Sequence, residues 1–195
     1  MFHPDHAMEI VSSVVITPEF PTIQVLWTAW CTGHGPGAKG VDWRDSTDWH
    51  GLVAEALQPI LTHVRDPSHC GMILATAKGN IAKIEAWMAA SRQGKRIDPV
   101  PELLSDSLNL VARKFGFGGP CYVVSTACTS GLTALIEAGE LLAGGMVSEV
   151  VVVAAETITD FTCSGFQALK ALTKTACRPF DRNRDGLALG SAAAA

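Results

Sequence analysis

One cysteine stands where the sequence favours nucleophilic chemistry. Cys128 lies in residues 125–131 (STACTSG), where a predicted strand gives way to a predicted helix. The first backbone N–H groups of a helix have no partner inside it, and the helix dipole is positive at that end. Both effects favour thiolate over thiol, which makes the side chain nucleophilic near neutral pH. The same N–H groups can hydrogen-bond the oxyanion that forms when a thiolate attacks a carbonyl carbon.

A strand–helix–strand unit positions this cysteine. Residues 121–125 (CYVVS) predict a strand, residues 129–143 a helix that ends at Gly144, and residues 149–155 (EVVVVAA) a second strand. The run of valines has no polar alternation, which is typical of a strand buried on both faces in a parallel sheet covered by helices. Because strand, helix and strand follow one another closely, they form a crossover unit, and the fold class is α/β.

The upstream sequence adds elements of both kinds. Apolar residues at helical spacing predict helices over 47–61, 81–92 and 101–115, and apolar runs predict strands over 9–17 and 70–76. Gly116 follows the third of these helices as a C-terminal cap. Residues 33–37 form a loop by composition, and no element is predicted between residues 18 and 45.

Composition places the chain among apolar, globular proteins. Residues 1–195 fit one domain, with 48% hydrophobic and 17% charged residues and a mean hydropathy of +0.23. This is apolar for a soluble monomer, so we expect part of the surface to be buried by a partner subunit or a missing second half. Four tryptophans are expected to pack in the core or at an interface, namely Trp27, Trp30, Trp43 and Trp49.

Several function classes are excluded by charge and patterning. The net charge of −4 leaves no basic patch, which argues against nucleic acid as the main ligand. No segment approaches the ~20 apolar residues needed to span a bilayer, and the start lacks the features of a secretory signal. The six cysteines include no C-x-x-C pair and predict free thiols in a reducing, cytoplasmic compartment.

Several ordered motifs resemble one enzyme family. TACTSG around Cys128 is followed by VVVAAE, then GFQALKALT, then CRPFDRNRDGLALG. Over residues 71–190 this order resembles the elongating beta-ketoacyl-ACP synthases of the thiolase superfamily. The RPFD and RDG motifs favour this branch over thiolases, chalcone synthases and initiating synthases. The resemblance implies the N-terminal half of a thiolase-like fold, with a mixed, mainly parallel sheet covered by helices.

The resemblance also implies a reaction. Cys128 matches the family nucleophile, which takes an acyl group from the phosphopantetheine thioester of acyl carrier protein, and its backbone N–H resembles an oxyanion donor. Malonyl carrier protein then loses carbon dioxide and attacks the Cys128 thioester, giving a 3-oxoacyl product for fatty acid, polyketide or pigment-like lipid synthesis. The family needs no metal or organic cofactor. Its partners are acyl carrier protein and a second subunit, in a homodimer or a heterodimer.

Other residues match family positions with weaker implications. Phe166 matches the residue that gates the acyl pocket, although an ordinary core phenylalanine is the alternative. Glu156 is expected to be structural, and Cys163 is expected to pack beside the acyl pocket. A hydrogen-bonded corner that supports the site is predicted from the loop residues Arg178, Asp181, Arg184 and Asp185.

The matched region lacks part of the family's catalytic set. The family's decarboxylation step uses two histidines and a lysine from the C-terminal half, whereas no histidine follows position 69 here. We expect surface or loop positions for His3, His6, His34, His50, His63 and His69. The chain stops inside GLALGSAAAA, where the family runs into a strand and has a Gly-rich run. Such a strand would leave an open edge and an uncovered sheet face. We therefore interpret the chain as a fragment or truncated gene product, inactive alone.

Two other functions remain as alternatives. The chain could be a non-catalytic acyl-binding or dimerisation partner of a ketosynthase, but such partners generally lack the nucleophilic cysteine. A cysteine hydrolase would need a histidine base beside Cys128, supplied from the first 69 residues. The sequence leaves the acyl chain length, the pathway and the identity of the carrier protein open.

Overall fold

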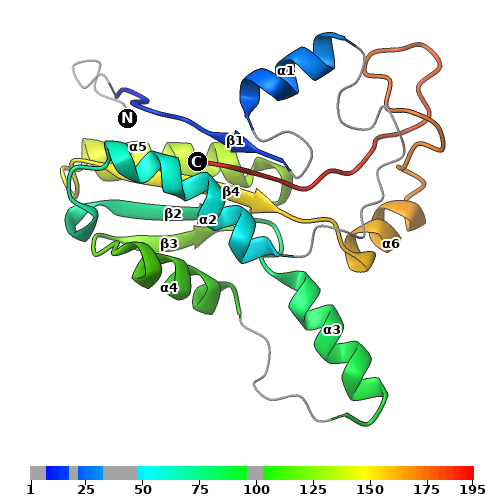
Figure 1. Cartoon of the computed structure of the whole chain (residues 1–195), viewed down its shortest axis with the longest axis horizontal. Helices are drawn as coiled ribbons and strands as arrows, with labels where there is room; N and C mark the ends of the chain where they lie inside the picture. The colour runs from blue at the N-terminus through cyan, green and yellow to red at the C-terminus, as the bar shows by residue number, and fades with distance from the viewer. Residues whose placement is uncertain (1–7, 18–21, 33–47, 96–102) are drawn as a thin grey trace.

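Helices cover both faces of a five-stranded sheet with strand order β1-β5-β4-β2-β3 (Figure 1). The computed structural model describes residues 8–17, 22–32, 48–95 and 103–195. The strands are β1 (Val15–Ile16), β2 (Gly71–Ala75), β3 (Cys121–Val124), β4 (Val150–Glu156) and β5 (Ala192–Ala194). The α-helices are α1 (Ile23–Cys31), α2 (Trp49–Ile60), α3 (Ile81–Arg92), α4 (Leu104–Phe115), α5 (Ser130–Ala143) and α6 (Asp160–Ala168). The α/β class and the mixed, mainly parallel sheet are as predicted.

Strand β2 lies between β4 and the edge strand β3, and it organises both layers. It pairs in parallel with β3 on one side and with β4 on the other. All of its residues are buried: Met72 and Leu74 pack in the cluster that holds α2 and α4, and Ile73 and Ala75 pack against α5. Because the three parallel strands run in one direction, their carboxyl ends meet at one edge of the sheet, where ligands bind in many α/β proteins.

The valine strand β4 is covered on both faces, as predicted, but unequally. Its residues alternate between fully and partly buried along the strand. Val151 and Val153 lie in the α2–α4 cluster, whereas Val150 and Val152 pack, only partly buried, against the α5 cluster. One helix layer therefore shields its face of β4 more fully than the other.

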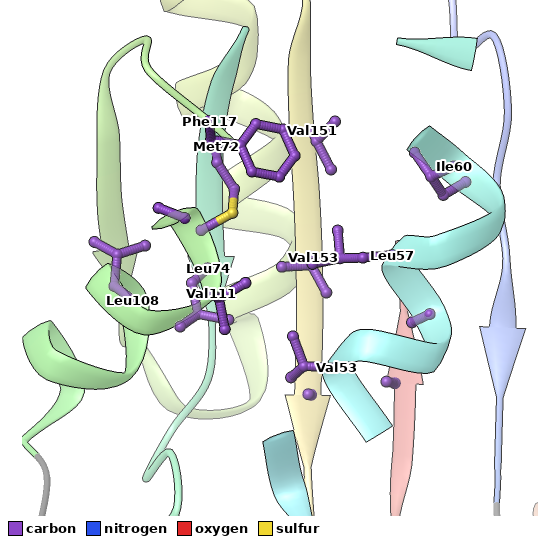
Figure 2. Packing of buried hydrophobic residues seen from close by; sticks show 14 of the residues in the cluster. Val53, Leu57, Ile60, Met72, Leu74, Leu108, Val111, Phe117, Val151 and Val153 are labelled. Carbon is purple, nitrogen blue, oxygen red and sulfur yellow. The ribbon is translucent and has the colours of Figure 1, made fainter. Parts of the chain in front are cut away.

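Helix α2 supplies much of the apolar contact with β4. Figure 2 shows Val53 and Leu57 on the face of α2 that points toward Val151 and Val153. This face follows from the apolar spacing of three and four residues in the sequence. At the start of α2, the fully buried Trp49 donates a hydrogen bond from Nε1 to the Ala155 carbonyl at 3.1 Å.

Most predicted elements are confirmed, and their ends move by a few residues. Helix α3 has the predicted bounds, and α4 ends at Gly116, whose φ of 79° is the left-handed conformation of a glycine cap. The strand predicted over 9–17 shortens to β1. Of the tryptophans predicted to pack in the core or at an interface, Trp49 is fully buried in the core. Trp27 is 67% exposed on α1, which excludes the core and leaves an interface as the prediction. The loop at 33–37, Trp43 and the side chain of Trp30 lie outside the described residues.

The C-terminal strand departs from the prediction. β5 does form in the alanine run, but it lies between β1 and β4 and pairs antiparallel with both, so the predicted open edge at this strand is wrong. Helix α2 contacts β5, which also contradicts an uncovered face on that side. Ala193 is 1% exposed in the α2 cluster. Small side chains in place of the family's glycines thus still allow close packing of α2.

Among the described residues, no helix has the length and apolar character needed to cross a lipid bilayer.

The packing of α2 on the sheet predicts which leucines matter for stability. We expect Leu57→Ala to lower the free energy of unfolding by about 2–5 kcal/mol, because the fully buried side chain would leave a cavity against β4. Leu110→Ala, at a half-exposed position of α4, should change it by less than about 0.5 kcal/mol. Urea denaturation followed by circular dichroism measures both, and equal effects would contradict the assigned core.

Candidate active site

Cys128 lies at the carboxyl edge of the sheet, between β3 and α5. β3 ends at Val124, and a single 3₁₀ turn, Ala127–Thr129 (η4), leads directly into α5 at Ser130. The Cys128 side chain is exposed, so a substrate can reach it. The strand-to-helix junction is therefore as predicted, with the helix beginning one residue later than expected.

The turn that carries Cys128 has an unusual backbone. Ala127 has a φ of 56°, the left-handed region that residues with a Cβ rarely adopt. Such a position costs on the order of 1–3 kcal/mol and persists only where its surroundings fix it. The orientation of Cys128 therefore depends on the contacts that hold this turn.

Hydroxyl groups close the turn from both sides. The Ser130 Oγ accepts a hydrogen bond from the Thr126 N–H at 2.9 Å and donates one to the Ala127 carbonyl at 2.6 Å. The Thr129 hydroxyl donates to the Thr126 carbonyl at 2.7 Å. Since Ser130 is buried, its two bonds are shielded from water. The TxxTS pattern thus encodes the turn, a signal that we did not extract from the sequence.

A second turn follows β2 and touches the first. Ser125 donates a hydrogen bond from Oγ to the Ala77 carbonyl at 3.2 Å. Glu156, at the end of β4, accepts hydrogen bonds from Thr76 Oγ1 at 2.9 Å and from the Ala77 N–H, and pairs with Lys78 Nζ at 2.8 Å. The ends of β2, β3 and β4 are thereby joined. Sequence reasoning placed Glu156 as structural but did not find these partners.

Phe166 lies at a different hollow, between α3 and α6. The hollow has a volume of about 780 Å³, and its apolar wall includes Met88, Phe161, Phe166 and Leu169. Phe166 is neither fully buried nor fully exposed. Of the described residues that line the hollow, none is Cys128. The structure therefore places Phe166 in an apolar hollow but does not join it to Cys128.

The loop after α6 folds into a hydrogen-bonded corner. Asp185 accepts hydrogen bonds from Thr173 Oγ1 at 2.6 Å and from the Lys174 N–H at 3.2 Å. The Thr173 hydroxyl in particular holds the pKa of the Asp185 carboxyl below its usual range. Arg178 donates to the Asn183 carbonyl at 2.7 Å.

The rest of this corner is held by contacts to Asp181. Asp181 accepts a hydrogen bond from the Asn183 N–H at 2.6 Å through its carboxylate, and one from Arg184 Nη1 at 3.0 Å through its carbonyl. Gly186 has a φ of 146°, and a Cβ there would lie 2.5 Å from the Thr173 nitrogen. The hydrogen-bonded corner is thus as predicted, whereas its support of the site stays a prediction. None of its charged groups reaches Cys128 in the described hydrogen bonds.

Burial separates Cys128 from three other cysteines. Burial raises the pKa of the Cys70 thiol to about 11 and also raises the pKa values of Cys121 and Cys163. Cys163 is 5% exposed on α6, which agrees with packing. Cys70 and Cys163 are buried and Cys121 is partly buried, whereas Cys128 is exposed.

No hydrogen bond or ion pair of the described histidines reaches Cys128. His63 and His69 are exposed, as predicted, but His50 is part of α2 and half-buried, so the prediction of a surface or loop position is wrong for it. His50 Nδ1 lies 3.1 Å from Asn80 Nδ2, a contact made possible because α2 starts beside the turn that precedes α3. His3, His6 and His34 lie outside the described residues. Within the described ranges, no group of three or more histidine, cysteine, aspartate or glutamate side chains could hold a metal ion.

The family follows from the comparison with known proteins. The sequence profile of the beta-ketoacyl synthase N-terminal domain matches residues 51–195, which include every element from α2 onward except the first two residues of that helix. The chain belongs to the beta-ketoacyl synthase family. Its relatives are named polyketide beta-ketoacyl synthases and 3-oxoacyl-[acyl-carrier-protein] synthases.

Curated relatives place this beta-ketoacyl synthase chain within the family. It is 30% identical over 188 residues to the oxytetracycline polyketide putative beta-ketoacyl synthase 1 of Streptomyces rimosus, a match that covers 82% of this chain and 44% of the relative. It is 33% identical over 138 residues to 3-oxoacyl-[acyl-carrier-protein] synthase 2 of Vibrio harveyi, covering 63% of this chain and 32% of that protein. The chain therefore spans less than half the length of these relatives.

Solved structures agree on the fold. The ketosynthase ApeO of Xenorhabdus doucetiae, in complex with its chain length factor ApeC, gives a structure that matches with a TM-score of 0.77 at 20% identity, covering 100% of this chain and 58% of that one. A structure of a type II polyketide acyl-carrier protein in complex with its ketosynthase matches with a TM-score of 0.73 at 19% identity, covering 95% of this chain and 55% of that one. Both support the thiolase-like, partial α/β fold.

The difference in burial predicts selective modification of Cys128. In the folded protein at pH 8, iodoacetamide should alkylate Cys128 and leave Cys70 intact, because Cys70 is 1% exposed and forms thiolate only as the pH approaches about 11. Peptide mass spectrometry gives the labelled fraction at each site. In guanidinium chloride both cysteines should react, and equal labelling in the folded protein would contradict the assignment.

Proposed function

We propose that Cys128 accepts an acyl group from a carrier-protein thioester, as the first step of a decarboxylative condensation. The observation that carries this proposal is an exposed thiol at the start of α5, on the carboxyl edge of the sheet, in a chain of the beta-ketoacyl synthase family. The two fully buried cysteines, Cys70 and Cys163, lack this exposure.

The acyl transfer proceeds by nucleophilic substitution at the thioester carbon. The Cys128 thiolate forms a bond to the carbonyl carbon, and the oxyanion that results accepts a hydrogen bond from the Cys128 backbone N–H. Collapse of this intermediate breaks the bond to phosphopantetheine, whose sulfur leaves and takes up a proton. The acyl group then remains on Cys128 as a thioester, so the difficult condensation is divided into two easier steps.

The second step forms the carbon–carbon bond. Malonyl carrier protein loses carbon dioxide, and the electron pair released attacks the Cys128 thioester carbon, expelling the thiolate and giving a 3-oxoacyl product on the carrier. No metal or organic cofactor is needed, because both substrates arrive activated as thioesters. The family's decarboxylation step uses a histidine pair, and no histidine follows position 69 in residues 1–195. The contribution proposed for residues 1–195 is acyl acceptance by Cys128.

The remaining predicted residues receive roles consistent with their positions. Phe166 in the α3–α6 hollow is proposed to contact the acyl chain or gate its path. The corner around Asp185 is proposed to support the adjacent loops through its internal hydrogen bonds. The relative named 3-oxoacyl-[acyl-carrier-protein] synthase 2 favours a carrier-bound acyl substrate.

We also propose that a second subunit of the same fold covers the β3 edge. Among the described residues β3 pairs with β2 alone, so its outer backbone groups are open to another strand. Beside it α5 exposes Leu132, Leu135 and Ile136, and α5 contacts β3 directly. The ketosynthase that matches this fold is itself described in complex with a chain length factor, which supports a paired arrangement.

Acylation of Cys128 tests the enzymatic proposal. Full-length protein mixed with an acyl-carrier-protein thioester should gain the mass of the acyl group, because the exposed thiol displaces phosphopantetheine. Cys128→Ala should gain none, whereas Cys177→Ala, at a cysteine of the supporting loop, should still be acylated. Intact-protein mass spectrometry measures the adduct, and equal labelling of wild type and Cys128→Ala would falsify the nucleophile assignment.

The non-catalytic alternative gives a different result in the same assay. A chain that only binds acyl groups or a partner subunit would alter product length in a complete synthase without forming a covalent adduct. The cysteine-hydrolase alternative would release free acid from the thioester at a rate that depends on Cys128.

Association through α5 is tested by a charge on its exposed face. Ile136→Asp should weaken pairing at least about tenfold in Kd, since an unpaired carboxylate would be buried at the interface. Val11→Asp introduces the same charge at a comparably exposed residue near the opposite sheet edge and should have no effect. Light scattering after size-exclusion chromatography gives the mass over a concentration series. A monomeric wild type, alone and with its partner subunit, would contradict the proposal.

A further inference from the structure

Glu156 takes no part in the chemistry proposed for Cys128, yet it joins two strand ends through both carboxylate oxygens. Oε1 accepts hydrogen bonds from Thr76 Oγ1 at 2.9 Å and from the Ala77 N–H, and Oε2 lies 2.8 Å from Lys78 Nζ. The Glu156 side chain is only 35% exposed and that of Lys78 23%, so solvent screens the pair less than it screens a pair on the open surface. Hydrogen bonds to a charged group are also the stronger kind.

The turn that Glu156 holds is fixed from the other side as well. The buried Thr76 hydroxyl donates to Glu156 and accepts a hydrogen bond from the Gly79 N–H at 2.9 Å, which closes residues 76–79. The Thr76 N–H donates to the Val124 carbonyl at 3.1 Å, at the end of β3. The 76–79 turn therefore lies between the ends of β3 and β4, and Glu156 supplies its only carboxylate contact among the described hydrogen bonds.

This turn contacts the turn that carries Cys128. The Ala77 carbonyl accepts a hydrogen bond from the Ser125 hydroxyl. The next residue, Thr126, donates its N–H to Ser130 Oγ. Ala127 then adopts its left-handed φ of 56° directly before Cys128. Since a residue in that region stays there only while its surroundings fix it, a looser 76–79 turn would release part of the constraint on Cys128.

We propose that Glu156 is a positioning residue: it holds the 76–79 turn against Ser125 and thereby fixes the orientation of the Cys128 thiol. The proposal rests on the nucleophilic role of Cys128 proposed above. Lys78, the ionic partner of Glu156, also lines the α3–α6 hollow. The same carboxylate thus stabilises a segment that contacts the nucleophile's turn on one side and borders the hollow of Phe166 on the other.

A purely electrostatic effect of Glu156 would have the opposite sign. Glu156→Gln removes a negative charge and leaves the Lys78 ammonium without its partner, and both changes favour a nearby thiolate. An electrostatic role therefore predicts unchanged or faster reaction of Cys128. Positioning predicts slower reaction, because the thiol spends less time in the reactive orientation.

Reaction rates of Cys128 in the full-length protein test the proposal. We expect Glu156→Gln to lower the rate constants for acylation by a carrier-protein thioester and for alkylation by iodoacetamide at least about tenfold, within the roughly 100-fold that a 1 Å misplacement costs. Glu149→Gln is the matched control, since Glu149 precedes β4 at its other end and is likewise held in an ion pair, with Arg65 at 2.8 Å. It should leave both rates unchanged. Circular dichroism and thermal unfolding show whether each variant is folded.

Ser125→Ala keeps the test decisive if Glu156→Gln does not fold. Ser125 is exposed, and the substitution removes only its hydroxyl contact with Ala77. It should lower the acylation and alkylation rates of Cys128 as well. Where both single variants fold, the double variant should react no more slowly than the slower single variant, because both substitutions act on the same contact. Wild-type rates in folded Glu156→Gln and Ser125→Ala would overturn the proposal. If iodoacetamide reacts more slowly in these variants while no thioester acylates the wild type, positioning stands and the proposed function fails. If a thioester acylates the wild type and the variants at the same rate, the proposed function stands and the positioning role of Glu156 fails.

Discussion

Parallel pairing of β2 with both β3 and β4 is the constraint on which the rest of the structure depends. It brings residues that are far apart in the sequence to one edge, where Thr76, Ser125 and Glu156 each lie at or just after a strand end. The pairing holds because β2 is buried on both faces by helices whose apolar residues follow the sheet. Without that double cover, neither the Cys128 turn nor the 76–79 turn would have a fixed neighbour.

The two hydrophobic cores fix different parts of the structure around the site. The larger one, between the sheet and helices α2 and α4, holds Trp49 and most of the fully buried side chains and fixes the strands. The smaller one, under α5, includes Ala134, Ala138 and Leu141 and fixes the helix that begins behind Cys128. The side of α5 that faces away from this core is exposed, and it is the face proposed above to meet a second subunit. Cys128 itself lies before the first turn of α5, where it combines a fixed backbone with an exposed side chain.

The sequence predicts the periodic part of this structure well. Buried strands such as β2 and β4, and helices with apolar spacing such as α2, depend on local patterns that are visible in one chain. The position of Cys128 at a helix start also follows from local pattern. Contacts between distant residues do not, because nothing in a single sequence shows that Glu156 will meet Ala77, or that β5 will lie between β1 and β4. The half-buried position of His50 does not follow from local pattern either, because its side chain contacts Asn80, thirty positions away.

Helix α3 has a consequence for the dynamics of the molecule. In the described structure none of its residues is fully buried, and in Figure 1 it projects away from the sheet. Its described tertiary attachments include the hydrogen bond from the Phe161 N–H to Glu85 and the apolar hollow shared with α6. A segment with so little buried surface opens at a small fraction of the global unfolding free energy, so its amide hydrogens exchange with solvent long before those of β2. The wall of the hollow that holds Phe166 is therefore intrinsically adjustable, whereas the edge that presents Cys128 is rigid.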